Sequence, residues 1–310
     1  MRDTVIRTLI DLGKKDKDIE IVTGDLGFGV LKPFWETLPN QFVNAGIAEQ
    51  NMTGVAAGMA LEGKKIFTYS IGNFPTLRCL EQIRNDCAYH KANVNIICVG
   101  GGYVYGSLGM SHHATEDIAI LRALPDVTVI CPGDPVEAEA AVKAIANTSG
   151  TCYLRLGRGG EKIINKNLKE FTIGKAYQIR QAKQSGKQIA VFSTGAILEE
   201  TSKACDMLEY QGFSVEQYSF PTVKPIDKET IANCAKRFDC IFTVEEHNVI
   251  GGFGSAVAEV LSELGSNTRL CRIGIDDFYC IEVGSQQYLR EQVGINAEGI
   301  AEKVRNTINE

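Results

Sequence analysis

The chain has 310 residues, of which 44% are hydrophobic, and a formal net charge of −6. This length is roughly two domains' worth of chain, and the apolar fraction is enough to build packed cores. Basic and acidic residues are interspersed, which argues against a nucleic-acid partner and against a polybasic membrane patch. No apolar run approaches the roughly 18 residues of a membrane span, and the opening MRDTVIRTLIDLGKK predicts an amphipathic helix, not a secretory leader. We therefore expect a cytoplasmic protein.

The ten cysteines lie singly in apolar stretches such as NIICVG and VTVICPG, and no C-x-x-C pair occurs. Such cysteines are typical of buried, reduced thiols, which agrees with a reducing compartment. The sequence indicates neither a disulfide framework nor a cysteine-ligated metal site.

The first strand is predicted within residues 19–27 (IEIVTGDLG), and it runs into a Gly-Asp turn. Asp25 therefore lies at the carboxyl end of a strand, which in a parallel sheet is the edge where ligands bind. An Asp beside Gly is also ordinary turn chemistry, so the residues alone leave both interpretations open.

Residues 41–63 (QFVNAGIAEQNMTGVAAGMALEG) predict a short strand followed by a tightly packed helix rich in Ala, Gly and Met. Glu49 lies close to the first turn of that helix. A carboxylate there can simply accept hydrogen bonds from the exposed amides of the first turn and interact favourably with the helix macrodipole. The residues that follow it are mostly apolar, however, and a carboxylate in apolar packing must be paired or keep its proton.

The next strand, KKIFTYS, ends at Tyr69, and Phe74 and Pro75 precede a segment with helical periodicity. The apolar positions of this period are Leu77, Leu80, Ile83, Cys87 and Ala88. We expect the helix to begin near Pro75. An aromatic ring ahead of a helix is usually a core residue, although a flat apolar ring also suits a flat heteroaromatic ligand.

A glycine-rich loop follows the strand NVNIICVGGG and contains the adjacent pair His112 and His113. Two histidines at the carboxyl end of a strand are candidates for acid–base or substrate-binding work. The alternative is a capping or metal-ligating pair, but no third ligand lies close in the sequence. Thr115, Glu116 and Asp117 then predict a helix start with acids in its first turn.

The first domain is expected to end with residues 151–160 (TCYLRLGRGG), a strand that delivers Arg155 and Arg158 to its carboxyl end. The two arginines cannot face the same side of a regular strand. Arg158, at the glycine-rich exit, is the better candidate anion ligand, with a solvated arginine as the alternative. Arg2 is a candidate second anion contact.

The sequence predicts an α/β protein with two doubly wound domains, 1–160 with a mostly parallel sheet and 188–310 smaller. The polar residues 161–187 between them predict a linker around a short FTIGKAYQI strand. In the second domain, strand, glycine turn and helix alternate. Its GGFGS lacks the GxxxxGK[ST] pattern, so it indicates tight helix–sheet packing and not a phosphate loop.

The segment GIAEQNMTGVAAGMA closely resembles a segment of the pyrimidine-binding domain of thiamine diphosphate enzymes of the transketolase and deoxyxylulose-phosphate synthase group. The resemblance implies that Glu49 hydrogen-bonds N1′ of the cofactor's aminopyrimidine and favours its imino tautomer. Phe74 or Tyr69 resembles the aromatic residue that stacks on the pyrimidine. The following RCLEQ resembles the family's R-x-x-D/E-Q signature, and Asp25 resembles an aspartate in the cofactor cleft.

The histidine-containing loop resembles the family's G-x-D-G-x-T-H-Q/H element, which implies that His112 hydrogen-bonds the donor's oxygens near the reacting carbon. Leu108 departs from the pattern, because transketolases carry there an aspartate that contacts the acceptor's C2 hydroxyl. Arg158 resembles the family's phosphate-binding arginine. VEEHNVIGGFGSAVAE resembles the transketolase C-terminal domain, in which we expect a structural role for His247.

The resemblance covers essentially the whole chain but only two of the family's three domains. The sequence lacks a G-D-G with a downstream Asn that would ligate Mg²⁺ and hold the diphosphate, so we expect no metal ligand in this chain. The resemblance therefore implies the C-terminal subunit of a split enzyme. A separate N-terminal subunit would carry the diphosphate-binding domain and most Mg²⁺ ligands, in an α2β2 assembly.

The activity expected from the resemblance is transfer of a two-carbon ketol unit from a ketose or ketose phosphate to an aldehyde acceptor. One alternative is a 1-deoxyxylulose-5-phosphate synthase-like or 2-oxo-acid dehydrogenase beta-type subunit that decarboxylates a 2-oxo acid. Another is a non-catalytic regulatory subunit that uses only the α/β scaffold.

Overall fold

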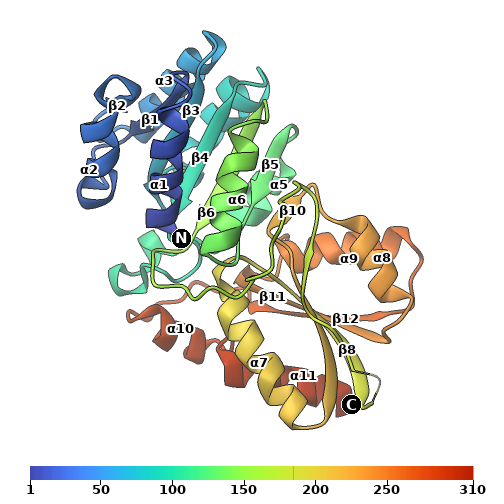
Figure 1. Ribbon diagram of the computed structural model, residues 1–310. Coiled ribbons are helices and arrows are strands. Elements are labelled where there is room, and N and C mark those ends of the chain that lie inside the picture. The colour runs from blue at the N-terminus through green and yellow to red at the C-terminus, as the bar shows by residue number, and fades with distance from the viewer. Residues whose placement is uncertain (184, 310) are drawn as a thin grey trace.

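The structure is a computed structural model that describes residues 1–183 and 185–309. Position 184, inside the predicted linker, and position 310, at the end of the predicted second domain, lie outside the described residues. Within the described residues the chain forms two mostly parallel sheets, one in each half, with helices on both faces (Figure 1). The predicted α/β class with two doubly wound units is confirmed.

The first sheet has the spatial order β10-β5-β6-β4-β3-β1-β2, and all its ladders are parallel except that between β10 and β5. Parallel neighbours bring their carboxyl ends to one edge, where the loops that follow them meet. The strands are β1 (Ile19–Thr23), β2 (Phe42–Asn44), β3 (Lys65–Ile71), β4 (Val94–Val99), β5 (Val127–Ile130), β6 (Thr151–Leu156) and β10 (Thr222–Lys224).

Successive residues of the central strands point to opposite faces of this sheet, and each face is covered by helices. Ile21 packs under α1 (Arg2–Gly13), α2 (Phe28–Thr37) and α6 (Pro135–Ile145). Val22 faces the opposite cluster, formed with α3 (Glu49–Leu61), α5 (Asp117–Ala123) and the helical segment between β3 and β4.

That helical segment is less regular than the sequence predicts. It begins at Leu77 and not at Pro75, as a 3₁₀ turn (Leu77–Cys79), continues as α4 (Leu80–Gln82) and ends as a π-helix (Ile83–Ala88). The preceding residues stay non-helical because the Thr76 hydroxyl donates to the Gly72 carbonyl oxygen (3.2 Å) and ties the chain into a turn. Arg78 therefore lies in the tight first turn.

The second sheet has the order β12-β11-β8-β9-β7, with only β7 antiparallel. The edge strand β7 lies inside the range 161–187 that was predicted as a linker, and β8 begins at its last residue. The strands are β7 (Tyr177–Arg180), β8 (Lys187–Thr194), β9 (Phe213–Ser219), β11 (Cys240–Asn248) and β12 (Arg269–Ile275). The helices are α7 (Leu198–Tyr210), α8 (Lys228–Ala235), α9 (Phe253–Glu263), α10 (Gln286–Gln292) and α11 (Ala297–Asn309).

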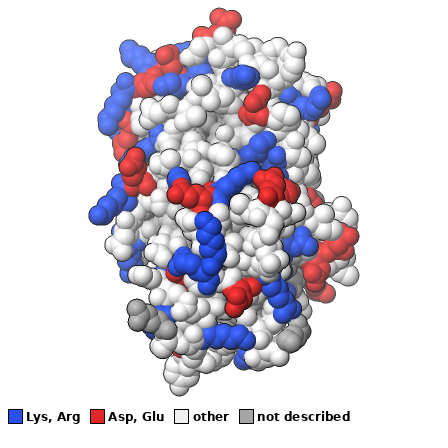
Figure 2. All heavy atoms as spheres, turned by 90° about the vertical axis from the view of Figure 1, so that its right-hand side faces the viewer, with Lys and Arg blue, Asp and Glu red and all other residues white. Residues whose placement is uncertain are grey.

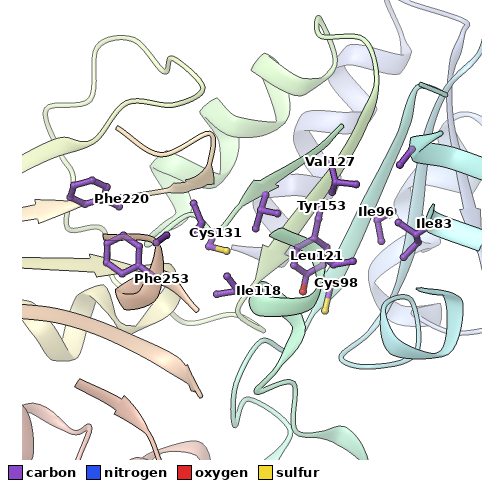
Figure 3. Packing of buried hydrophobic residues seen from close by; sticks show 14 of the residues in the cluster. Ile83, Ile96, Cys98, Ile118, Leu121, Val127, Cys131, Tyr153, Phe220 and Phe253 are labelled. Atoms are coloured by element: carbon purple, nitrogen blue, oxygen red, sulfur yellow. The ribbon is translucent and has the colours of Figure 1, made fainter. Parts of the chain in front are cut away.

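One hydrophobic cluster runs without interruption from the first sheet into the second half (Figure 3). Cys131, just after β5, lies between Tyr153 of the first sheet and the rings of Phe220 and Phe253. Strand β10, which follows Phe220, pairs with β5 and extends the first sheet. The two halves are therefore held together by a shared core as well as by the connecting chain.

The ten cysteines are unpaired, and nine of them are buried, which confirms the expectation of buried thiols. On the face of the molecule in Figure 2, basic and acidic side chains alternate and no single-sign patch dominates. Within the described residues, no helix is long and apolar enough to cross a bilayer.

Candidate active site

Glu49 is the first residue of α3, and its side chain is 5% exposed. The carboxylate does not cap its own helix, since the capping position is Ala48 and no side-chain cap is formed. Instead Glu49 Oε2 accepts a hydrogen bond of 3.0 Å from Nη1 of Arg78, whose side chain is half exposed. A carboxylate removed from water needs such a partner. The structure therefore agrees with a paired carboxylate at Glu49, and not with one that interacts only with the amides and dipole of its helix.

Arg78 also connects Glu49 to the aromatic residue ahead of its helix. The guanidinium carbon of Arg78 lies 4.5 Å from the centroid of the Phe74 ring. The Phe74 ring in turn meets the His112 imidazole edge-on, with centroids 5.1 Å apart. Three predicted site residues, Glu49, Phe74 and His112, therefore form one continuous group through Arg78. They follow β2, β3 and β4 at the carboxyl edge of the first sheet.

Tyr69, the alternative stacking ring, is placed differently. It is 2% exposed within β3, and its ring packs against Gly27, where an added Cβ would lie 2.8 Å from Tyr69 Cε1. Burial raises the pKa of the Tyr69 hydroxyl above its ordinary value. The position of Tyr69 thus does not support the alternative that its ring faces a ligand, because its side chain points inward from the strand and packs in the core.

Asp25 lies in the turn after β1, where the backbone is left-handed (φ 58°). Its backbone N–H donates to Asn44 Oδ1 (3.0 Å), and its Oδ1 accepts from Asn44 Nδ2 (2.9 Å). These bonds join the ends of β1 and β2 beside the start of α3. The neighbouring Gly24 lies close to the Glu49 side chain, so Asp25 borders the group at Glu49 while serving as a turn residue.

Arg2 and Arg158, the two predicted anion ligands, come together at a residue that the sequence did not single out. Arg158 is exposed, and its guanidinium carbon lies 5.6 Å from the ring centroid of Tyr105. The Arg2 cation lowers the pKa of the Tyr105 phenol, against the larger raising effect of burial. Two cations from distant segments therefore flank one tyrosine of the glycine-rich loop.

Residues 103–113, here named the histidine loop, place the two adjacent histidines in different surroundings. His112 is half-buried, and its Nδ1 lies 3.1 Å from the Ser111 hydroxyl. His113 is 4% exposed and meets the Tyr103 ring edge-on at 5.0 Å. Burial lowers the pKa of His113. His112 therefore contacts Phe74, whereas His113 packs on Tyr103.

A cleft of about 270 Å³ adjoins the histidine loop. It is lined by Asn73, Leu77, Tyr103, Met110, His113, Thr115, Glu116, Tyr279 and Cys280. Leu108, the predicted departure from the family pattern, is 55% exposed on the same loop. The next residue, Gly109, lies against Val283 of the second half. Both halves of the chain therefore contribute to the surroundings of this cleft.

Asp117 is the first residue of α5, which agrees with the predicted helix start with acids in its first turn, and its carboxylate has further partners in the core. It is fully buried and accepts hydrogen bonds from Arg155 Nε (2.7 Å) and from the Tyr153 hydroxyl. Burial alone would raise the pKa of Asp117, but Arg155 and the other positive or donating groups around it hold that pKa below its ordinary value. Arg155 points into the core from β6, and Asp117 supplies the counter-charge that it needs there.

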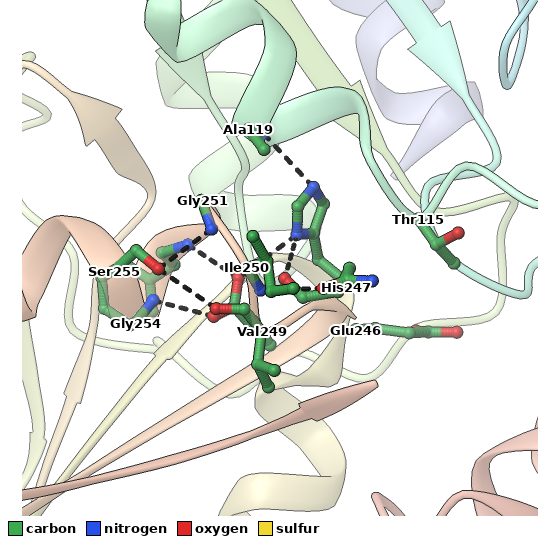
Figure 4. Close-up of polar contacts among 12 residues, drawn as sticks. Thr115, Ala119, Glu246, His247, Val249, Ile250, Gly251, Gly254 and Ser255 are labelled. Atoms are coloured by element: carbon green, nitrogen blue, oxygen red, sulfur yellow. Dashed lines mark hydrogen bonds and ion pairs between the residues drawn. The ribbon is translucent and has the colours of Figure 1, made fainter. Parts of the chain in front are cut away.

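His247 is fully buried at the end of β11 (Figure 4). Its Nε2 accepts from the Ala119 N–H (3.3 Å), and its Nδ1 therefore carries the proton and donates to the Asn248 carbonyl oxygen (2.7 Å). Burial lowers the pKa of His247 to about 4, so the ring is neutral at neutral pH. These contacts agree with the structural role expected for it.

The GGFGS segment packs a helix onto a sheet, as the sequence indicates. Glu245 of β11 accepts hydrogen bonds from the backbone N–H groups of Phe253 (2.6 Å) and Gly254 (2.8 Å) at the start of α9. A Cβ on Gly254 would come within 2.6 Å of the Thr243 hydroxyl. The glycines are therefore needed for close approach, and the helix start is already occupied by a carboxylate.

Among residues 1–183 and 185–309, no three His, Cys, Asp or Glu side chains gather in a way that could hold a metal ion. Sequence reasoning missed Tyr105, Tyr103 and Glu246 as parts of the site. Their contacts join segments far apart in the chain, so no local pattern marks them. Arg78 was visible only as the first letter of RCLEQ.

Comparison with known families gives two matches along the chain. Residues 1–160 match the model of the transketolase pyrimidine-binding domain, and residues 178–300 match that of the transketolase C-terminal domain. A protein of Methanocaldococcus jannaschii named as a putative transketolase C-terminal section is 39% identical over 98% of this chain and 95% of its own length. A protein of Phocaeicola vulgatus named as an apulose-4-phosphate transketolase subunit is 36% identical over 96% of this chain and 94% of its own length.

Longer relatives and a solved structure agree with these matches. The 1-deoxy-D-xylulose-5-phosphate synthase of Heliobacterium modesticaldum is 33% identical over 96% of this chain, which spans 45% of that protein. A solved split-gene transketolase, described as an inactive beta4 tetramer, superposes with a TM-score of 0.86. It is 33% identical and is aligned over 98% of this chain and 96% of its own. Given these matches and the pyrimidine-domain residues gathered around Glu49, the chain belongs to the transketolase family.

Proposed function

We propose that this chain is the C-terminal subunit of a split, thiamine diphosphate-dependent transketolase-like enzyme. In this proposal it helps to move a two-carbon ketol unit from a ketose or ketose phosphate to an aldehyde acceptor. The observation that carries the proposal is the buried Glu49 carboxylate, joined through Arg78 to Phe74 and His112 at the carboxyl edge of the sheet.

The residues around Glu49 fit the cofactor's pyrimidine. Glu49 is buried, and Arg78, which pairs with it, is half exposed, so the carboxylate lies where the core meets solvent. Phe74 offers a flat apolar ring beside that carboxylate, as a flat heterocycle requires. When bound, thiamine diphosphate supplies a nucleophilic carbon that carries the two-carbon unit.

Each residue of this chain then has a distinct task. Glu49 holds a proton at the pyrimidine N1′, and Phe74 fixes the plane of the ring. His112, half-buried beside Phe74, donates hydrogen bonds to the donor's oxygens. Arg158 and Arg2, which both lie near Tyr105, hold the substrate's phosphate. Asp25 keeps the strand ends beside Glu49 in place.

The proposal includes a partner subunit that supplies the diphosphate-binding domain and the Mg²⁺ ligands. Support comes from two relatives that this chain matches almost end to end, one named as a C-terminal section and one as a transketolase subunit. An α2β2 assembly in the cytoplasm is the expected form. The relative named for apulose 4-phosphate favours a ketose phosphate as donor.

Reconstitution tests the split. The purified chain alone should have negligible turnover, and addition of the N-terminal subunit, thiamine diphosphate and Mg²⁺ should restore it. Fructose 6-phosphate cleavage with an aldehyde acceptor is compared with pyruvate decarboxylation in the same mixture. Full activity from the isolated chain would refute the split, and pyruvate turnover without ketose cleavage would replace ketol transfer by the synthase-like reaction.

Glu49→Gln tests the central assignment in the reconstituted enzyme. We expect loss of at least about 10³-fold in kcat with an unchanged assembly, because the amide keeps the shape of the side chain but cannot exchange a proton. Glu62→Gln, at the exposed end of the same helix, is the matched control and should keep wild-type turnover. Cofactor binding that appears only with the partner separates an enzyme from a regulatory subunit, which would bind none.

A further inference from the structure

The neck of the histidine loop is closed by contacts within the first half of the chain. Gly102 and Ala114 pair across it, with N–H···O distances of 2.7 Å and 3.0 Å. Arg155 Nη2 donates to the Ala114 carbonyl oxygen (2.8 Å) from below, and its Nε is held by Asp117. The loop that carries His112 therefore leaves the sheet through a short, hydrogen-bonded base.

The second half of the chain contacts this base through a buried carboxylate. Glu246 of β11 is 2% exposed, and its Oε1 accepts a hydrogen bond of 2.8 Å from the backbone N–H of Tyr103, the first residue of the loop. A Cβ on Gly102 would lie 2.5 Å from Glu246 Cγ, and Gly102 has a left-handed backbone (φ 67°). The glycine is needed both for the turn and for the approach of this side chain.

The charge of Glu246 is balanced by groups of α10. Arg290 donates from Nε (3.1 Å) and Nη2 (2.6 Å) to Oε2, and Gln286 Nε2 lies 3.0 Å from both oxygens. Arg290 is itself 7% exposed. The loop-facing carboxylate is thus fixed from behind by a buried, hydrogen-bonded ion pair, an arrangement that restricts its rotamer.

Two further contacts bring the loop onto the second half. The Tyr103 side chain, 1% exposed, belongs to the core cluster of the second sheet. A Cβ on Gly106 would collide with Leu289 of α10. In addition, the Asn248 N–H donates to the Thr115 carbonyl oxygen (2.8 Å), so both ends of the loop meet the end of β11. In Figure 4, Glu246 points away from the hydrogen bonds of His247, on the side of the view where Thr115 lies.

We infer that Glu246, with Arg290 behind it, is a positioning residue that fixes the histidine loop so that His112 stays against Phe74. Glu246 does not reach the reacting atoms and acts through the backbone of Tyr103. The inference gives the C-terminal domain a task at a site to which it contributes no proposed catalytic side chain. Its catalytic consequence rests on the proposed function, whereas the anchoring of the loop does not.

Hydrogen exchange of the loop amides tests the anchoring in the full chain, without any substrate. Glu246→Ala should speed exchange across residues 103–113 by about ten-fold or more, because it leaves the Tyr103 N–H and the Arg290 guanidinium unsatisfied. The matched control is Glu216→Ala. It removes another buried carboxylate of the second sheet, which is paired with Arg237 and lies on β9, away from the strand β11 that contacts the loop. That variant should leave loop exchange unchanged.

A conservative pair of substitutions separates positioning from loss of fold. Glu246→Gln/Arg290→Met keeps an acceptor oxygen for the Tyr103 N–H and removes the guanidinium that would otherwise lose its counter-charge. It should restore slow exchange in residues 103–113, and it gives a readout even if Glu246→Ala does not fold. Loop exchange that is fast in this double variant as well would overturn the assignment to the Tyr103 hydrogen bond.

Kinetics of the reconstituted enzyme test the consequence. Glu246→Ala should lower kcat by about a hundred-fold, the scale expected for a displaced group, with thiamine diphosphate affinity unchanged. In a His112→Ala background the same substitution should cause no further loss, because the histidine it positions is gone. Additive losses would overturn the inference. If no variant and no wild-type assembly transfers a ketol unit, the proposed function fails, while the exchange result still decides the anchoring.

Discussion

Arg78 donates a hydrogen bond of 3.0 Å to the buried carboxylate of Glu49 and at the same time lies 4.5 Å over the ring of Phe74. The pair joins a residue with 5% exposure to one whose side chain is half in solvent. Glu49 is thus removed from water yet lies next to a half-exposed side chain, and a carboxylate that exchanges a proton with a ligand must be both dehydrated and accessible.

Arg78→Met should lower kcat of the reconstituted enzyme by about ten- to a hundred-fold, since Glu49 loses the cation that holds its geometry. The stability cost should be only about 1 kcal/mol because the arginine is half exposed and solvent screens the pair. Urea unfolding and initial rates measure the two effects. Arg84→Met, an exposed arginine of the following π-helix, serves as the control. Wild-type kcat in Arg78→Met would remove this arginine from the site.

Leu108→Asp should change acceptor preference. The leucine is 55% exposed, so the substitution should be tolerated, and a carboxylate there can accept a hydrogen bond from an acceptor's C2 hydroxyl. We expect the ratio of kcat/KM for glycolaldehyde over acetaldehyde to rise by about ten-fold.

Leu264→Asp introduces the same charge at an exposed position of the second half and should leave that ratio unchanged. An unchanged ratio in Leu108→Asp would mean that this position does not face the acceptor.

Arg155→Met should lower the free energy of unfolding by about 3–5 kcal/mol, because Asp117 is left as a buried charge without its cation. The Ala114 and Glu246 carbonyl oxygens also lose a donor. Urea titration at neutral pH measures the change. Lys228→Met, which breaks a pair with Glu263 in which both side chains are exposed, should cost at most about 1 kcal/mol. Equal costs for the two variants would contradict the importance given to burial.

His247 should make the folded state sensitive to acid. Its folded pKa of about 4 lies below the ordinary value of 6.5, so the unfolded chain binds a proton that the folded chain excludes. The stability that this group contributes is complete above pH 6.5 and is lost as the pH falls. The loss in unfolding free energy reaches about 3 kcal/mol near pH 4. Asp117 and Glu245 face the ring at 3.9 Å and 3.6 Å, and Arg155 lies near.

The whole-protein pH profile does not isolate this effect. Burial raises the pKa of Glu137 and of Glu245 to about 7, so these two groups favour the folded state as the pH falls from 7 toward 4.5. The difference in unfolding free energy between wild type and His247→Gln should therefore be measured from pH 7 to 4. It should shift in favour of the glutamine variant as the pH falls, whereas His90→Gln, an exposed control, should give a flat difference.

Predictions from local pattern were most successful where one segment carries its own signal. The apolar run and helix around Glu49, the alternation of strands and helices, and the packing role of GGFGS are all local, and each agrees with the structure. Local pattern gave no information where a distant segment supplied the partner. Asp117 begins its helix as predicted, but the pattern did not reveal its burial against Arg155, 38 positions away. Tyr69 was one of two candidate rings, and the pattern did not reveal that its side chain packs in the core.

The sequence by itself determined the two α/β units, the dehydrated start of the helix at Glu49 and the glycine loop that carries His112, because strand period, helix period and glycine chemistry act between near neighbours. Only the tertiary structure decided which aromatic ring lies beside Arg78, where Arg2 and Arg158 meet, and how the loop is held. The hydrogen bond from Tyr103 to Glu246 spans 143 positions. Such a contact exists only after two sheets have packed on a shared core, since burial creates the need for each partner and the fold alone selects it.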